Sequence, residues 1–296
     1  MKNSRKIQNI GLISVAGLAL IGLIIGSFLD QKITGKMGNY DNLFGIIFTA
    51  FGPVLTLAFG VFAGATLFFM PKLENKKLNI VFKILGAVAV LGFIFTQVKE
   101  GLPWVDFPRM QAEKSTYKVL IIVFITLIDL AIILFSRIWV KKMDQNEILF
   151  VCVMIIAIFV VYFVACEGVK YIASRPRPRV LDQGLHEFKQ WYQFNPFGAF
   201  KTENEDCKSF VSGHAANAAC LITMLPLVSA LSKREYNKWI QILCIVIGGL
   251  FAFVVAFSRI IARAHFMSDV MGGILLSCAI QALAINVKPF VFKKAQ

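Results

Sequence analysis

The sequence predicts an all-α fold, a polytopic bundle of about eight membrane-spanning helices. Hydrophobic residues make up 57% of the 296 residues and charged residues only 16%, whereas a soluble domain is about one quarter charged. The mean hydropathy is +0.70. Apolar runs of about 20 residues, the length that crosses a bilayer, recur along the whole chain. We therefore expect residues 1–296 to form a single integral membrane domain.

Eight apolar runs are the expected helices. They are residues 10–29, 43–70, 78–98, 119–140, 148–169, 215–231, 239–257 and 268–287. The second run is long, and Gly52-Pro53 is expected to kink it. The first follows a basic start, as in a signal peptide. Its apolar run is too long for one and no small-residue cleavage site follows, so we expect a retained anchor.

Charge indicates how the bundle is oriented. The net charge of +14 would suggest nucleic acid in a soluble protein, but most basic residues lie at the ends of apolar runs and no nucleic-acid-binding signature is present. They predict contact with anionic lipids instead. The connections 71–77, 141–147 and 232–238 and both termini are basic, so we expect them to be cytoplasmic. The connection 170–210, expected outside, is rich in arginine, which suggests a functional site.

A polar group closes the run that ends near residue 257. Ser258 and Arg259 are followed by His265 and Asp269. On a helix, residues four apart share a face, so the Asp269 carboxylate can hold the His265 imidazole. An oriented histidine beside an arginine suits nucleophilic attack on a phosphate. The alternative is a buried pair that merely joins two helices.

Two further clusters fall at the same expected end of the bundle. Lys170 ends the fifth helix and Arg177-Pro178 follows. Ser212, Gly213 and His214 open the sixth helix, where free backbone N–H groups bind anions well. The arginines of this loop would otherwise form a solvated basic patch at the lipid headgroups, and His214 alone would be an ordinary interfacial histidine.

Together these three pieces resemble the type 2 phosphatidic acid phosphatase superfamily. Its first motif is a lysine, six residues and Arg-Pro, as in Lys170, Arg177 and Pro178. Its second is Pro-Ser-Gly-His, which here has Val211 in place of the proline. Its third is Ser-Arg, five residues, His, three residues and Asp, and residues 258–269 fit it completely.

The resemblance implies a role for each motif residue. His265 would be the nucleophile that forms a phosphohistidine, and Asp269 would fix its tautomer. His214 would be the general acid. The phosphoryl oxygens would be held by the remaining motif groups, which are Lys170, Arg177, Arg259 and the N–H groups of Ser212 and Gly213. The family has a core of six membrane helices, so the resemblance places that core in residues 78–296, its motifs in 170–269, and additional helices in 1–77.

The implied function is a membrane phosphatase acting on a lipid phosphate or diphosphate in the bilayer. Candidate substrates are a prenyl diphosphate, phosphatidylglycerol phosphate and phosphatidate. The active site would face outside, and the composition and short loops favour a bacterial plasma membrane. Fixed cations can neutralise a phosphoryl group, and no carboxylate cluster or paired-cysteine spacing would bind a metal, so we expect neither metal nor cofactor.

Two alternatives and two features stay open. The same site could pass phosphate to another lipid or sugar, as a phosphotransferase, or the fold could serve as a transporter or scaffold without turnover.

Aromatic residues between positions 188 and 200 either anchor the loop at the interface or cover a lipid chain. Asp129, inside the fourth apolar run, is a functional suspect or a partner of a neighbouring helix.

Overall fold

The computed structural model describes residues 2–70, 75–102, 114–142, 144–184, 186–196, 205–231 and 237–287. Within these residues, seven helices are long and apolar enough to cross a membrane. They are α1 (Lys2–Met37), α2 (Leu43–Phe69), α3 (Lys76–Gly101), α4 (Lys114–Trp139), α5 (Gln145–Ala173), α10 (Lys238–Ile261) and α11 (Met267–Asn286). Shorter elements are η3 (Val140–Lys142), α6 (Pro178–Leu181), η4 (Glu205–Cys207), α8 (Gly213–Ala219) and α9 (Leu221–Leu231). The prediction of a polytopic membrane helical bundle is confirmed.

The sixth expected helix is interrupted near its first third. The run 215–231 was expected to be continuous, but α8 ends at Ala219 and α9 begins at Leu221. Gln281 of α11 meets the interruption: its Nε2 donates to the Ala219 carbonyl at 3.1 Å, and its Oε1 accepts from the Thr223 backbone N–H at 3.2 Å. Because backbone groups inside a bilayer must be satisfied by protein, this one buried amide makes the break possible.

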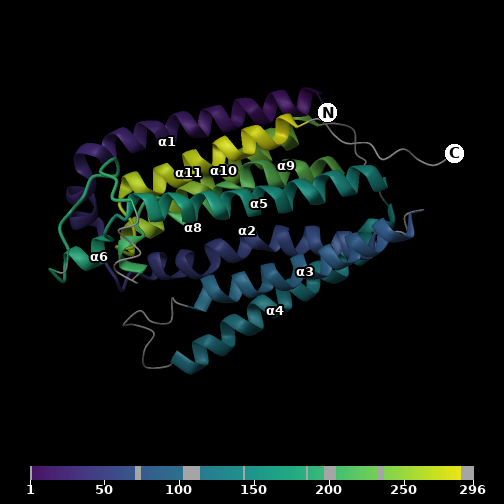
Figure 1. Ribbon diagram of the computed structural model, residues 1–296, viewed down its shortest axis with the longest axis horizontal. Coiled ribbons are helices and arrows are strands. Elements are labelled where there is room, and N and C mark those ends of the chain that lie inside the picture. The colour runs from purple at the N-terminus through teal and green to yellow at the C-terminus, as the bar shows by residue number, and fades with distance from the viewer. Residues whose placement is uncertain are drawn as a thin grey trace.

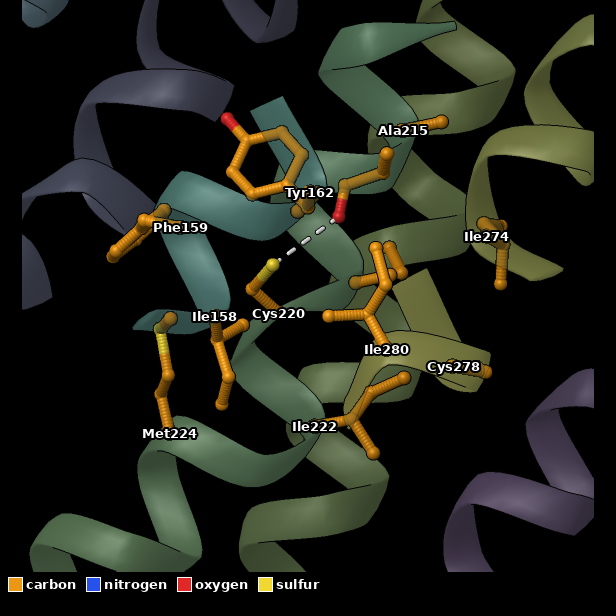
Figure 2. Close-up of a cluster of buried hydrophobic side chains, with 14 of the residues drawn as sticks. Ile158, Phe159, Tyr162, Ala215, Cys220, Ile222, Met224, Ile274, Cys278 and Ile280 are labelled. Carbon is orange, nitrogen blue, oxygen red and sulfur yellow. Dashed lines mark hydrogen bonds between the residues drawn. The ribbon is translucent and has the colours of Figure 1, made fainter. Parts of the chain in front are cut away.

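The helices form an inner group and an outer pair (Figure 1). α1 lies along α11 and also contacts α10, while α2 packs on α5, α8 and α10. α3 and α4 lie along α2 at the lower edge of the view. The main apolar core lies where α5, α8, α9 and α11 meet, with side chains such as Ile158, Cys220 and Ile274 packed together (Figure 2).

Glycines bring α2 and α3 into backbone contact. A Cβ added at Gly64 would lie 2.9 Å from the Gly86 carbonyl oxygen, and one at Gly86 would lie 2.6 Å from the Gly64 carbonyl oxygen. Helices in lipid associate through such close van der Waals packing, since apolar burial gives no preference for protein over acyl chains. This contact holds α3 against α2.

All three motif segments lie at one end of the bundle. The end of α5 with the following loop, the start of α8, and the turn between α10 and α11 gather at the left of Figure 1, and the start of α1 and the end of α11 lie at the right. Helices that cross in alternating directions therefore bring together segments nearly a hundred residues apart in the chain.

Candidate active site

His265 lies in the turn between α10 and α11 and is 2% exposed. Its Nδ1 is 2.8 Å from the backbone carbonyl oxygen of Ser209. A carbonyl oxygen only accepts, so this contact assigns the hydrogen to Nδ1 and leaves the lone pair on Nε2. The imidazole is therefore held in the tautomer that a nucleophile needs.

Positive groups from four elements surround that imidazole. Burial, followed by the positive charges of Arg177 and Arg259, holds the pKa of His265 well below its ordinary value of 6.5. His214 and Lys170 act in the same direction from further helices. The ring is thus neutral near pH 7. The structure brings four of the predicted site residues close to His265. They are Lys170, Arg177, Arg259 and His214.

Contacts with neighbouring side chains position two of these cations, Arg259 and Lys170. Arg259 is 5% exposed, and its Nη1 donates to the Thr49 hydroxyl of α2 at 2.6 Å. Its buried Nε has no hydrogen-bond partner among the described residues. The Lys170 ammonium is 2.5 Å from Glu167, and a Cβ added at Gly213 would lie 3.4 Å from it. Glycine at position 213 thus leaves room for the lysine head.

His214 has one hydrogen-bond acceptor and one nearby carboxylate from the N-terminal part of the chain. Its Nε2 is 3.2 Å from the Thr49 carbonyl oxygen, and its Nδ1 is 3.8 Å from the Glu100 carboxylate at the end of α3. Neither Thr49 nor Glu100 belongs to a motif, and sequence reasoning missed both. The chemistry-bearing segments of the C-terminal half are therefore completed by α2 and α3.

Asp269 differs from its expected role. Its carboxylate is 3.9 Å from His265 Nδ1, too far for a hydrogen bond. It accepts instead from the Ser209 hydroxyl at 2.5 Å, from Arg175 Nη1 at 2.5 Å and from the Phe266 backbone N–H at 2.8 Å. The first turn of α11 directs the Asp269 carboxylate towards the loop that contains Ser209. Asp269 is therefore linked to the imidazole indirectly, through Ser209, whose carbonyl accepts from the ring.

Ser212 also differs from expectation. Its backbone N–H donates to the Asp269 carbonyl oxygen at 3.0 Å, so it is occupied rather than open to a phosphate. Ser212 is fully buried, and its hydroxyl has no hydrogen-bond partner among the described residues. Gly213 begins α8 as predicted, and its contribution through the N–H group stays a prediction.

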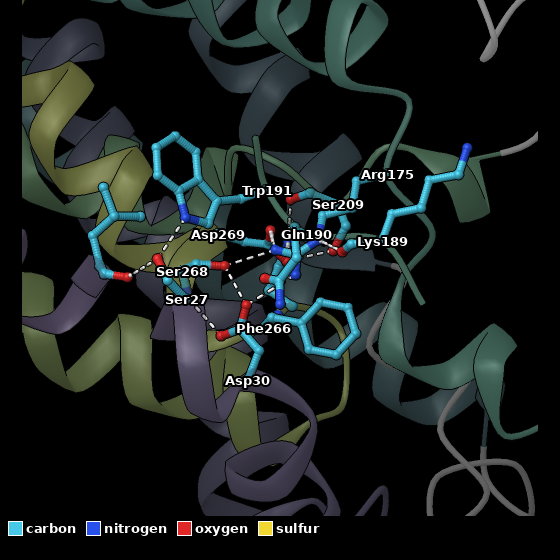
Figure 3. A network of polar contacts seen from close by, with 12 residues as sticks. Ser27, Asp30, Arg175, Lys189, Gln190, Trp191, Ser209, Phe266, Ser268 and Asp269 are labelled. Carbon is cyan, nitrogen blue, oxygen red and sulfur yellow. Dashed lines mark hydrogen bonds and ion pairs between the residues drawn. The ribbon is translucent and has the colours of Figure 1, made fainter. Parts of the chain in front are cut away.

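Three further arginines of this end are paired with acids. Arg175 is 1% exposed and lies inside the polar network of Figure 3, not at a headgroup surface. Arg179 pairs with Asp206 at 3.0 Å. Arg263 pairs with Asp182, so it is directed towards the loop.

The aromatic residues of the loop divide into two groups. The Trp191 indole N–H donates to Ser27 of α1 at 2.8 Å, and Phe188 contacts the Phe266 ring. Tyr192 and Phe194 are exposed, and Phe197 and Phe200 lie outside the described residues. A small cavity of about 110 Å³ below the loop is lined by residues such as His186 and Cys207.

Asp129 is a partner of a neighbouring helix. It accepts a hydrogen bond from Gln97 of α3 at 3.3 Å, and the same amide donates to the Val54 carbonyl oxygen of α2 at 3.2 Å. The pair therefore joins α4, α3 and α2, as one of the two sequence readings expected.

Comparison with known proteins identifies the region that carries these residues. Residues 147–293 match the model of the PAP2 superfamily. The C-terminal half of this chain belongs to the PAP2 superfamily. Phosphatidylglycerophosphatase B of Bacillus subtilis (strain 168) is 36% identical over 81 residues, a stretch that covers 25% of this chain and 36% of that relative. No solved structure matches the chain. The PAP2 region contains all three motifs, whereas Thr49 and Glu100 lie outside it.

Proposed function

We propose that this chain is a membrane-embedded phosphatase that hydrolyses a lipid phosphate or diphosphate through a phosphohistidine at His265. The observation that carries the proposal is the neutral, buried His265 imidazole, with Nδ1 bonded to a carbonyl and with Lys170, Arg177, Arg259 and His214 around it, within a PAP2 region. Neutral imidazole is a nucleophile and fixed cations stabilise a phosphoryl transition state.

The reaction has two steps. Nε2 of His265 attacks phosphorus, the bond from phosphorus to the leaving oxygen breaks, and His214 gives that oxygen a proton. Water, losing its proton to His214, then attacks phosphorus; the bond from phosphorus to Nε2 breaks, which releases phosphate and restores the neutral His265. Arg177, Arg259 and Lys170 hold the nonbridging oxygens throughout. These cations supply the charge neutralisation, so the proposed enzyme needs no metal.

The proposed substrate is a lipid whose phosphate enters at the motif end of the bundle while its chains stay in the bilayer. The relative's name is phosphatidylglycerophosphatase B, which makes phosphatidylglycerol phosphate the first substrate to test, ahead of phosphatidate and a prenyl diphosphate. We place this site on the extracytoplasmic side of a plasma membrane, opposite the basic connections.

Phosphate release by the purified protein tests the proposal. We expect wild type to act on at least one of the three lipids and His265→Ala to lose activity by on the order of 10⁴-fold or more. His186→Ala, a histidine at the same end but outside the site, is the matched control and should keep wild-type activity. Release of labelled phosphate into water, unchanged by a chelator, supports the hydrolase; transfer to an added alcohol alone indicates a phosphotransferase. No turnover of any lipid phosphate would refute the proposal.

A further inference from the structure

Asp30, near the C-terminal end of α1, is buried although it lies in the helix farthest in sequence from the PAP2 motifs. It is 2% exposed. A buried carboxylate is costly unless it is paired and hydrogen-bonded. Asp30 is both: Arg175 Nη2 donates to its Oδ2 at 2.9 Å, and the Ser268 backbone N–H donates to its Oδ1 at 2.9 Å. The Ser268 hydroxyl donates to it as well.

Arg175 links this carboxylate to a second one. Its Nη1 donates to Asp269 Oδ1 at 2.5 Å, and its Nε donates to the Lys189 carbonyl oxygen at 2.7 Å. The guanidinium also lies 4.4 Å from the centre of the Phe266 ring. Every nitrogen of the guanidinium therefore has a partner, and its planar shape fixes Asp30 and Asp269 relative to each other (Figure 3).

Both carboxylates also cap the same helix. Asp269 accepts from the Phe266 N–H and Asp30 from the Ser268 N–H, two of the donors that the first turn of α11 leaves without helical acceptors. α1 approaches closely enough for this because Gly26 faces α11: an added Cβ would lie 2.7 Å from the Ser268 nitrogen. The start of α11 is thus held by an acid of its own and by one from α1.

The network ends at the imidazole. Ser209 receives two constraints from it, since its hydroxyl donates to Asp269 at 2.5 Å and its backbone N–H donates to the Arg175 carbonyl oxygen at 3.0 Å. The carbonyl of the same Ser209 holds His265 Nδ1 at 2.8 Å. A path of hydrogen bonds therefore runs from Asp30 through Arg175 and Asp269 to the ring.

We propose that Asp30 is a positioning residue for His265, acting through Arg175 and Asp269 to fix the Ser209 carbonyl and the start of α11. It does not touch the phosphate. The inference deepens the proposed function and rests on it. Its consequence is that α1, which lies outside the PAP2 region, is part of the catalytic machinery.

Asp30→Asn tests the proposal because it keeps the shape of the side chain and removes its charge. We expect kcat to fall by roughly 10- to 100-fold, since small misplacements of a reacting group cost that much, while KM for the lipid changes less than about threefold because Lys170, Arg177 and Arg259 remain in place. Thr34→Val is the matched control. Thr34 is buried one turn further along α1, and its hydroxyl has no partner among the described residues, so it should keep the wild-type kcat.

Three results would separate the possible failures. Wild-type kcat in a folded Asp30→Asn protein overturns the positioning role, and so does an equal loss in Thr34→Val. An inactive wild-type protein refutes the proposed function instead. His265→Ala in the same assay shows whether the measured phosphate release depends on His265. If Asp30→Asn does not accumulate in membranes, Asp30→Glu keeps the charge, displaces it by one methylene and is read by the same kcat and KM criteria.

Discussion

A neutral imidazole surrounded by cations is the central feature at the level of single residues. Protonation of His265 would add a charge to a site where burial and the charges of Arg177 and Arg259 already oppose one. The neutral and the protonated imidazole can both donate from Nδ1 to the Ser209 carbonyl. The free-energy cost of protonation therefore comes from the added charge and not from a lost hydrogen bond. The reactive lone pair is therefore present at and below neutral pH.

This penalty predicts a pH dependence of stability. The pKa of His265 is lowered in the folded protein, so as the pH falls below about 6.5 the unfolded chain takes up a proton that the folded chain does not. Folding stability is therefore lost on acidification through this window, by at most about 1.4 kcal/mol per pH unit from this residue. Thermal unfolding in detergent between pH 7.5 and 5.5 should show a steeper loss for wild type than for His265→Gln; parallel curves would contradict it.

The motif residues could be named from the sequence because their order and spacing resemble the three motifs of a known family. Asp30 could not be, because a single acid at the end of an apolar run has the appearance of an interfacial residue, and its partner Arg175 is 145 positions away. The same holds for the Ser209 carbonyl, since a backbone acceptor leaves no trace in composition. The direct role expected for Asp269 was wrong in geometry because four-residue spacing gives proximity without setting the direction of the side chain.

At the level of helices, the position of the outer pair, α3 and α4, indicates which helices make up the core of the bundle. α2 packs on α5, α8 and α10, and α1 packs on α10 and α11, whereas α3 and α4 lie along α2. The sequence placed the additional helices in residues 1–77, an assignment that stays a prediction. The packing favours α3 and α4 instead, and leaves α1, α2, α5, the split α8–α9, α10 and α11 as an inner six-helix group.

The glycine contact between α2 and α3 predicts an effect of added volume. Gly64→Val places side-chain atoms against the Gly86 backbone, 2.9 Å from the first added carbon, and overpacking of this kind costs about 1–3 kcal/mol. The detergent unfolding temperature should fall, and activity should fall with it because α3 carries Glu100 towards His214. Gly92→Ala is the matched control: nothing lies within 4 Å of its added Cβ, so no loss of stability is expected. Equal behaviour of the two variants would refute the contact.

The order of the long helices followed from apolar run length, while helix ends did not; in place of eight continuous helices, the described residues contain seven long ones and the split α8–α9. α1 extends over Lys2–Met37, well beyond the expected 10–29, because polar residues continue a helix where the hydrophobic window stops. The interruption of the sixth helix depends on Gln281, which lies in another helix. A contact with a residue distant in sequence can therefore set where a helix ends, and the local hydrophobic pattern does not contain that information.

For the whole molecule, the two ends of the bundle differ in character. The His265 end gathers paired charges and a long loop, and the opposite end has the start of α1 and the end of α11 (Figure 1). Basic residues also open two other helices, Lys76 and Lys77 in α3 and Lys238 in α10. The positive-inside rule assigns the second end to the cytoplasm, which is the orientation that the proposed function uses.

Cysteine labelling tests that orientation. In a cysteine-depleted background, Glu187→Cys at the His265 end should react with a membrane-impermeant maleimide in intact cells, since Glu187 is exposed. Lys77→Cys, exposed at the other end, should react only after lysis. The native Cys207 is unsuitable because it is 5% exposed. The reverse pattern would place the site in the cytoplasm.

The pairing of α1 with α11 has a consequence for biogenesis. Asp30 meets Ser268 across 238 positions of sequence, so the surroundings of His265 are complete only after the last helix has entered the membrane beside the first. A nascent chain in which α11 has not inserted has Lys170, Arg177 and His214 but lacks the contacts of His265 with these groups. If the proposed function is correct, activity is therefore expected only after α11 has been synthesised and inserted.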